Sequence, residues 1–250
     1  MPYDVALHST GAYRYLPAIF PYSSGVAAEP GYEIVGLRLQ EPPPVVEGFT
    51  RLDRELDARG LASTSLVGIE LRSPAPFTFG GFDEFNQLYR NLLEERGLIE
   101  GDVNPIARTN VVPVHEPPVQ PVLFSAFFVQ SESGLGGIDF VIAGSGEVSG
   151  ALDPDNIVAR GDVSPGGLAL KVAAVLDEMR ARITSLGHTT DEPTLTNVYT
   201  AHDIAGLPDS LFEGLPATGR WGYAYWLTRP PVVEVEFEMD CRKVSSWIAL

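Results

Sequence analysis

Two arginines and a row of alternating carboxylates are the side chains of this sequence best suited to chemistry. Arg108 and Arg220 each stand at the head of an expected strand, and Glu234, Glu236 and Glu238 alternate with apolar residues near the end of the chain. A guanidinium group can bind a carboxylate through two parallel hydrogen bonds. A desolvated carboxyl group beside other carboxylates has a raised pKa and can exchange protons near neutral pH. These residue types therefore allow anion binding next to proton transfer.

Arg220 begins an expected strand whose same face continues with Gly222 and Ala224. These small residues leave room for a ligand beside the guanidinium. The alternative is a structural ion pair with one of the 33 acidic residues, and the residues alone favour that alternative. Arg108 has the corresponding place in the first half of the chain, but the strand that closes this half carries no carboxylate.

Glu234 is the candidate acid–base group, and Glu236 is an equally good candidate for the same position. Both lie on the polar face of an expected strand over residues 232–240. Carboxylates two residues apart on one face lie roughly 6.5–7 Å from each other, so their repulsion raises the pKa of a desolvated member. The alternative is a solvated edge strand whose acidic residues suppress aggregation. The pattern supports both equally.

Other positions offer groups that could bind a ligand. The backbone amides around Ser145 and Gly146 can donate to an anion or a carbonyl group. Tyr22 can stack on a substrate or hydrogen-bond it, or it can simply pack in the core. Four scattered histidines and the single Cys241 lack the spacing of metal ligands, so we expect no metal site.

The elements that must position these groups occur twice along the chain. Each half predicts two strand–helix units, then the segment with the arginine and a closing strand, which gives a repeat of roughly 110 residues. The first half predicts strands at 32–39, 65–71 and 122–129, and helices around 49–56 and at 82–95. The second predicts strands at 140–148, 194–199 and 232–240, and helices at 168–186 and 201–212. This order places both helices of a unit on one face of a mixed sheet and leaves the other face for a partner sheet.

The helix predicted at 168–186 has the clearest local signals. Apolar residues recur at intervals of three or four, as on one face of a helix. Ser164 stands at the N-cap, Pro165 at the first helical position and Gly187 just past the end.

Composition narrows the classes of partner and the location. A net charge of −16 with only 17 basic residues argues against nucleic acid binding. No apolar run of membrane-spanning length and no basic amphipathic helix occur, so we expect no membrane association. The N-terminus has no visible signal peptide, and one cysteine permits no intrachain disulfide, so a cytoplasmic location is expected.

Short motifs in both halves resemble the RidA/YjgF family in tandem. Residues 19–25 resemble the opening Gly-Pro-Tyr-x-x-Gly segment of that family, with Phe20 in place of the first glycine. Residues 141–148 resemble its Ser-Gly-Gln strand end, residues 105–108 its Pro-Ala-Arg segment, and residues 233–236 its closing Val-Glu-Ile-Glu strand. The order and spacing of these motifs over residues 16–243 carry the resemblance. The run 161–163 before a long helix also resembles the chorismatases, which contain related two-domain folds.

The resemblance implies an α+β fold of two tandem RidA/YjgF-like (chorismate mutase-like, bacillus type) domains, at residues 1–130 and 131–250. It also implies a homotrimer with ligand sites in clefts between subunits. In the family the arginine that matches Arg220 holds the substrate carboxylate, and the glutamate that matches Glu234 or Glu236 orients the attacking water. The two halves are complementary, because the first has Tyr22 and Arg108 but no carboxylate, and the second has the carboxylates but no Pro-Tyr segment.

We therefore expect a cofactor-free hydrolase that deaminates a small carboxylated enamine or imine of the aminomuconate type. Glu234 and Arg220 would be catalytic, and Arg108, Tyr22, Ser145, Gly146 and Glu236 would bind the substrate. The alternatives are a chorismatase-like hydrolase of an enol ether and a non-catalytic protein that binds a carboxylated metabolite.

Overall fold

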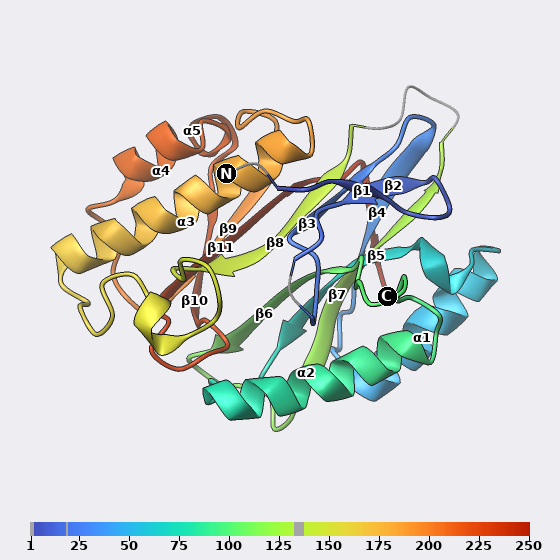
Figure 1. The fold of residues 1–250 in the computed structure, drawn as a ribbon, viewed down its shortest axis with the longest axis horizontal. Coiled ribbons are helices and arrows are strands. Elements are labelled where there is room, and N and C mark those ends of the chain that lie inside the picture. Colours follow the sequence, from blue (N-terminus) through green and yellow to red (C-terminus); the bar gives the residue numbers. More distant parts are fainter. Residues whose placement is uncertain (1–2, 19, 133–137) are drawn as a thin grey trace.

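The computed structural model describes residues 3–18, 20–132 and 138–250, and it has helices on two outer sides with strands between them (Figure 1). The strands are β1 (Ala6–Leu7), β2 (Tyr13–Tyr15), β3 (Gly25–Ala28), β4 (Tyr32–Arg38), β5 (Leu66–Arg72), β6 (Ala107–Pro113), β7 (Val122–Ser131), β8 (Phe140–Gly146), β9 (Leu195–Thr200), β10 (Ala224–Arg229), β11 (Phe237–Lys243) and β12 (Ser246–Ala249). The α-helices are α1 (Val45–Ala58), α2 (Phe79–Glu94), α3 (Pro165–Ser185), α4 (Pro208–Gly214) and α5 (Ala217–Trp221). Residue 19 of the opening motif and residues 133–137 between the halves lie outside the described residues.

One strand order occurs twice in the 12-stranded sheet that the described residues form. In the first half, the neighbours β4, β7, β5 and β6 pair antiparallel, antiparallel and parallel. In the second half, β8, β11, β9 and β10 pair in the same way and the same order. This is the mixed-sheet unit predicted from the sequence. Pairing of β6 with β10 joins the two halves into a continuous sheet, where two separate sheets were expected. The division at residues 130 and 131 stays a prediction.

Helices α1 and α2 cover one face of the first half. The predicted stripe of Phe49, Leu52 and Leu56 on α1 packs with Tyr89 and other apolar residues of α2 in one buried cluster. Helix α2 begins three residues earlier than expected, at Phe79 instead of residue 82. The side chain of Thr78 accepts a hydrogen bond from the backbone amide of Gly81 and caps the helix there.

Helix α3 covers the second half and follows its predicted signals. The Ser164 side chain accepts a hydrogen bond from the Gly167 amide, and Pro165 is the first helical residue. Gly187, with φ +82°, lies just past the helix end. The buried stripe of α3 packs on Phe140 and Ile142 of β8 and on β11.

A third apolar cluster fills the space between the sheet halves. It includes Ile34 and Phe127 from the first half and Val141 from the second. The N-terminal strands β2 and β3 contribute Tyr13 and Val26 and extend the second half from β8. The inner sheet faces are therefore covered within one chain.

The segment around Arg220 forms a helix, where the sequence predicted the start of a strand. Helix α5 ends at Trp221 and is followed by Gly222, whose φ of +78° suits glycine, and β10 starts at Ala224. The helix predicted at 201–212 is the shorter α4, which starts at Pro208, a residue suited to the first turn. Arg108, in contrast, is the second residue of β6. The prediction that Arg108 and Arg220 occupy equivalent positions is therefore wrong.

Strand β11 begins five residues later than predicted, at Phe237 instead of residue 232. The reason is a contact from a distant part of the chain. The buried carboxylate of Glu147 accepts hydrogen bonds from the backbone amides of Glu236 (2.7 Å) and Phe237 (2.9 Å). Glu234 just before this point has φ +68°, which is incompatible with a strand.

Candidate functional site

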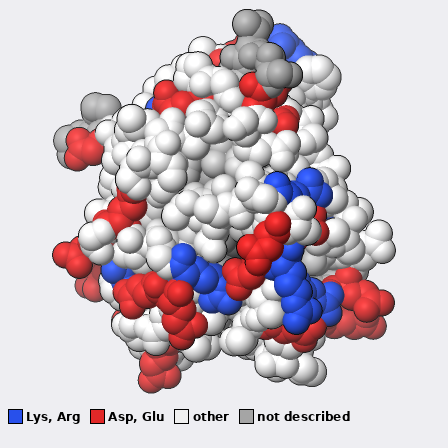
Figure 2. Space-filling model, turned by 90° about the vertical axis from the view of Figure 1, so that its right-hand side faces the viewer, with Lys and Arg blue, Asp and Glu red and all other residues white. Residues whose placement is uncertain are grey.

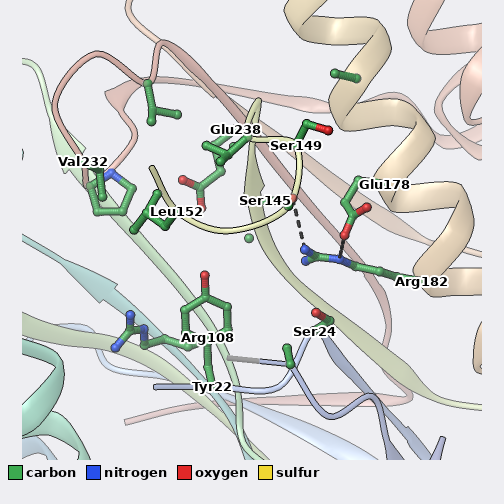
Figure 3. A pocket seen from close by; sticks show the side chains of 18 of the residues that line it. Tyr22, Ser24, Arg108, Ser145, Ser149, Leu152, Glu178, Arg182, Val232 and Glu238 are labelled. Atoms are coloured by element: carbon green, nitrogen blue, oxygen red, sulfur yellow. Dashed lines mark hydrogen bonds and ion pairs between the residues drawn. The ribbon is translucent and has the colours of Figure 1, made fainter. Parts of the chain in front are cut away.

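A cavity of about 760 Å³ lies where the two halves of the chain meet. Figure 3 shows side chains from both halves around it. Tyr22, Arg108 and Asn110 line it from the first half, and Ser145, Gly146, Arg182 and Glu238 line it from the second.

Arg108 is a buried cation whose side chain packs against aromatic rings. It is 3% exposed, and its guanidinium carbon lies 4.8 Å from the ring centres of both Tyr22 and Tyr89. Its Nη1 atom has no hydrogen-bond partner among the described residues, and neither has the amide nitrogen Nδ2 of Asn110, two residues along the same strand. Burial lowers the pKa of Arg108 below its usual value. A buried guanidinium group that has no acidic partner among the described residues is suited to bind an anionic ligand.

Glu238 is a buried carboxyl group on the inner face of β11. It is 4% exposed and forms no ion pair or side-chain hydrogen bond with another described residue. Burial raises its pKa well above the usual range, and the nearby charges of Asp240 and Glu147 raise it further. Arg108 and Arg182 act in the opposite direction but are the weaker influences. These influences favour the protonated form of Glu238, which can donate a proton and then take one back.

Gly144 makes the space that the Glu238 carboxyl occupies. A Cβ atom on Gly144 would overlap Oε1 of Glu238 and lie 3.1 Å from Cγ2 of Thr109. Thr109 in turn donates a hydrogen bond to Asp240 (2.8 Å) and accepts one from the Gly144 amide (2.9 Å). These contacts fix three strands, β6, β8 and β11, beneath the carboxyl group.

Asp240 belongs to a buried polar network between the sheet halves. Its carboxylate also accepts hydrogen bonds from Asn197 (2.8 Å), Tyr199 (2.9 Å) and Arg242 (2.6 Å). Arg242 reaches across to Glu70 of the first half (2.8 Å) and holds the pKa of that carboxyl group well below its usual value, at about 2. These hydrogen bonds hold the Asp240 side chain in place close to Glu238.

Arg182 of α3 reaches the cavity from the side opposite Arg108, as Figure 3 shows. Its Nε donates to Glu178 (2.9 Å), Nη1 to the Ala143 carbonyl (3.1 Å) and Nη2 to the Ser145 hydroxyl (3.1 Å). It is 7% exposed. These bonds fix the orientation of the guanidinium group at the cavity wall.

The Pro-Tyr segment places the Tyr22 hydroxyl so that it points into the cavity (Figure 3). Asn104 donates a hydrogen bond to the Pro21 carbonyl (2.7 Å), and Ser23 donates one to the Pro105 carbonyl (3.0 Å). These bonds tie the segment to the residues that lead into β6. Burial raises the pKa of Tyr22, so its hydroxyl is a neutral hydrogen-bond donor and acceptor.

The sequence matches, over residues 5–248, the family described as 2-aminomuconate deaminase CnbZ. A 2-amino-5-chloromuconate deaminase from Comamonas testosteroni is 42% identical over 245 residues, which cover 96% of each chain. The chain belongs to the CnbZ deaminase family.

One solved structure, a chorismatase, shares the fold of this CnbZ family member. This chorismatase aligns with 98% of this chain and 80% of its own, with a TM-score of 0.51 and 14% identity, which shows a common fold alone. The YjgF gene product from E. coli covers 42% of this chain and 80% of its own, with a TM-score of 0.26 and 15% identity. The sequence analysis predicted an α+β fold related to that of the chorismatases, and this prediction is confirmed.

Four of the residues predicted for the site line the cavity, namely Tyr22, Arg108, Ser145 and Gly146. Three others lie outside it. Arg220 is exposed on α5. Glu234 is exposed and forms an ion pair with Arg160. Glu236 hydrogen-bonds His202 (2.7 Å) and lies 3.4 Å from Arg229. The predicted catalytic pair, Arg220 and Glu234, therefore lies apart from this cavity.

Glu238 and Arg182 line the cavity but were not chosen from the sequence. Glu238 lies on the same polar face as Glu234 and Glu236, so the alternating pattern offered three equivalent candidates. Arg182 lies seven residues after Val175 on the buried stripe of α3, and a charged residue on such a stripe signals a polar environment within the fold.

Neither a metal cluster nor a membrane span is found in the described parts of the CnbZ chain. Residues 3–18, 20–132 and 138–250 contain no group of three His, Cys, Asp or Glu side chains placed to bind a metal ion. Within the same ranges, no helix has the length and apolarity needed to cross a bilayer. On the face drawn in Figure 2, basic side chains lie beside acidic ones, so their charges offset each other locally.

Proposed function

We propose that this protein hydrolyses an aminomuconate-type enamine, or its imine tautomer, to the corresponding ketone and ammonia. The observation that carries the proposal is that Arg108, a buried cation with no acidic partner among the described residues, shares one cavity with the buried carboxyl group of Glu238, whose pKa is raised. The relative from Comamonas testosteroni is named for the deamination of 2-amino-5-chloromuconate. Such a compound carries its amino group on the carbon next to a carboxylate, so a substrate of this class fits a site with a cation beside a proton donor.

Arg108 binds the carboxylate next to the amino-bearing carbon. Its Nη1 has no partner among the described residues, and Asn110 offers a second free donor from the same strand. A charge-assisted bond to a buried guanidinium orients the substrate and offsets the cost of burying both charges. The ring of Tyr22 lies 4.8 Å from the guanidinium carbon, and both side chains line the cavity.

Glu238 moves the protons. It first protonates the enamine carbon, which gives an iminium ion and the Glu238 carboxylate. The carboxylate then takes a proton from water while the water oxygen bonds to the iminium carbon. Glu238 returns that proton to the amine nitrogen, the carbon–nitrogen bond breaks, and the remaining hydroxyl proton goes back to Glu238. The sum is enamine plus water to ketone plus ammonia, with Glu238 again protonated.

The experiment is an assay of 2-aminomuconate loss, followed by the absorbance of its conjugated diene, with ammonia measured in parallel. We expect equal amounts of substrate lost and ammonia released. Glu238→Gln removes the proton donor and should lower kcat with little effect on KM. Arg108→Met should lower kcat/KM by roughly thirtyfold to several thousandfold, since one partner of a buried charge pair is lost.

Arg220→Met and Glu234→Gln are the matched controls, because both residues are exposed and outside the cavity. Each should retain the activity of the unchanged protein. Full activity of Glu238→Gln would overturn the assignment of the proton carrier. Tight binding of the substrate without ammonia release would favour a binding protein, and turnover of enol ethers alone would favour the chorismatase-like alternative.

Two expectations about the protein in the cell are part of this proposal. We propose a homotrimer and a cytoplasmic location, on the grounds given by the sequence. Both halves of the cavity come from one chain, so catalysis as proposed does not depend on the assembly.

A further inference from the structure

We propose that Arg182, together with the hydroxyl group of Ser145, binds the carboxylate at the far end of the substrate, so that the site selects dicarboxylates. This inference rests on the proposed function, since it assigns the second pole of the same substrate. Arg182 comes from α3 of the second half, and Arg108 comes from β6 of the first. Figure 3 shows the two guanidinium groups on opposite sides of the cavity, with the Glu238 carboxyl group between them.

Arg182 has hydrogen-bond donors left for a ligand. A guanidinium group carries five N–H donors. Three bonds to Glu178, Ala143 and Ser145 use one donor each on Nε, Nη1 and Nη2. The remaining donors are one on Nη1 and one on Nη2, and both are charge-assisted donors that a carboxylate can accept from.

The Ser145 hydroxyl adds a donor at the same place. Its oxygen accepts a hydrogen bond from Nη2 of Arg182 (3.1 Å), which leaves its own proton free for another acceptor. Ser145 and Arg182 both line the cavity. A carboxylate beside them could therefore accept bonds from both.

Glu178 restricts the position of that carboxylate. It occupies the Nε side of Arg182 at 2.9 Å and is 32% exposed at its side chain. Its charge repels an anion on the Nε side and leaves the Nη1 and Nη2 donors for a ligand. Because Glu178 also offsets the charge of Arg182, this subsite depends on directional hydrogen bonds more than on net charge.

Binding at both poles fixes which way the substrate lies. A muconate skeleton has a carboxylate at each end and an amino group next to only one of them. With the amino-side carboxylate at Arg108 and the distal one at Arg182, the carbons between them cross the cavity past Glu238. A substrate with only one carboxylate would leave the donors of Arg182 and Ser145 without a partner, which costs binding energy.

The experiment compares 2-aminomuconate with its two monomethyl esters in the unchanged protein and in Arg182→Gln. For the unchanged protein we expect kcat/KM to fall about thirty- to hundredfold when the distal carboxylate is esterified, in line with the loss of a charged hydrogen-bonded contact. Arg182→Gln should lower kcat/KM for the dicarboxylate to the same degree and leave the value for the distal ester unchanged. The amino-side ester lacks the carboxylate assigned to Arg108, so Arg108→Met should not lower kcat/KM for this ester.

Arg180→Gln is the matched control, because Arg180 lies on the same helix in an exposed pair with Asp177. Arg180→Gln should leave kcat/KM unchanged for both the dicarboxylate and the distal ester. If Arg182→Gln lowers kcat/KM equally for the dicarboxylate and the distal ester, Arg182 has a structural role and the inference is overturned. Equal kcat/KM values for these two compounds in the unchanged protein would also overturn the inference.

A binding measurement separates this inference from the proposed reaction. Unsubstituted muconate has both carboxylates and no amino group to remove. Calorimetry should show that it binds the unchanged protein about thirty- to hundredfold more tightly than its monomethyl ester does, and that Arg182→Gln removes the difference. If muconate shows this preference and no deamination occurs, the proposed function fails and the dicarboxylate site stands. Equal affinities for muconate and its ester would overturn the site, whatever the result for turnover.

Discussion

At Glu238 the fold holds a carboxyl group in surroundings that oppose its ionisation. The group is buried, and the charges of Asp240 and Glu147 are close to it. Arg242, Tyr199 and Asn197 all donate hydrogen bonds to the Asp240 side chain. The protein therefore maintains a neutral acid at a cost in stability, as acid–base sites commonly do.

That cost predicts a pH-dependent gain in stability for Glu238→Gln. In the unfolded chain Glu238 ionises near its ordinary pKa of 4.5, whereas in the folded chain it stays protonated to a much higher pH. The stability that Glu238 contributes is therefore full below the unfolded pKa and is lost as pH rises toward the folded pKa. Glutamine does not titrate, so the stability advantage of Glu238→Gln should grow by at most about 1.4 kcal/mol per pH unit in this window.

Thermal or urea unfolding of both proteins between about pH 5 and pH 8 measures this difference. A difference that stays constant with pH would mean that Glu238 is ionised in the folded protein. The proton steps proposed above would then need a different donor.

Sequence alone could not choose among the three alternating glutamates. The pattern at residues 234, 236 and 238 is periodic, and a short motif match can slide along it by two residues. The choice depends on where β11 begins, and this is set by Glu147, about ninety positions earlier in the chain. Tyr22, Arg108, Ser145 and Gly146 could be selected because each stands in a short motif with its own local conformation.

At the scale of elements, five of the six predicted strands start within one residue of their place in the structure, and the strand predicted from residue 232 is the exception. Helix α3 has the clearest local signals among the helices. Ser164, Pro165 and Gly187 lie within one turn of the ends of α3, so the sequence shows where that helix begins and ends. The C-terminal strands lack such signals. The alternation of apolar and acidic residues predicted a strand from residue 232. In the structure Val235 of this segment packs with Phe82 of the other half, and this long-range contact could not be read from the local pattern.

The buried pair of Glu147 and Lys171 holds this segment in place. Both side chains are 0% exposed, and Nζ of Lys171 lies 3.1 Å from Glu147 and 2.9 Å from the Val158 carbonyl. Lys171→Met would leave the Glu147 charge buried without its cation. We expect a loss of about 3–5 kcal/mol in the free energy of unfolding, measured by urea denaturation.

The double variant Lys171→Met with Glu147→Gln should recover part of this loss, because it removes the unpaired charge while the amide can still accept from the Glu236 and Phe237 backbone. A double variant that is as unstable as the sum of the single ones would indicate that the two side chains act independently.

At the scale of the whole molecule, the chain covers both inner sheet faces by itself. The cluster between the halves contains Tyr13, Val26, Ile34, Phe127 and Val141, all buried. The N-terminal strands complete this layer, a role that the sequence did not reveal because β2 and β3 are only 3 and 4 residues long.

We predict a trimer of this chain at micromolar concentration, measured by light scattering coupled to size exclusion. The expected mass is three times that of the 27.0 kDa chain. A monomer that retains full deaminase activity would contradict the assembly and leave the catalytic proposal intact, since the cavity needs only one chain.

Placing Arg108 and Glu238 in different halves of a single polypeptide changes what mutation can do to the site. In a ring of identical subunits, each amino-acid change is copied into every cleft, so both walls of a cleft evolve under one shared constraint. A covalent tandem releases that constraint, because one half can lose its carboxylate while the other loses its Pro-Tyr segment. Selection can then refine the two walls separately, for example by adding Arg182 on one side alone. The asymmetry that results suits a substrate whose two ends differ.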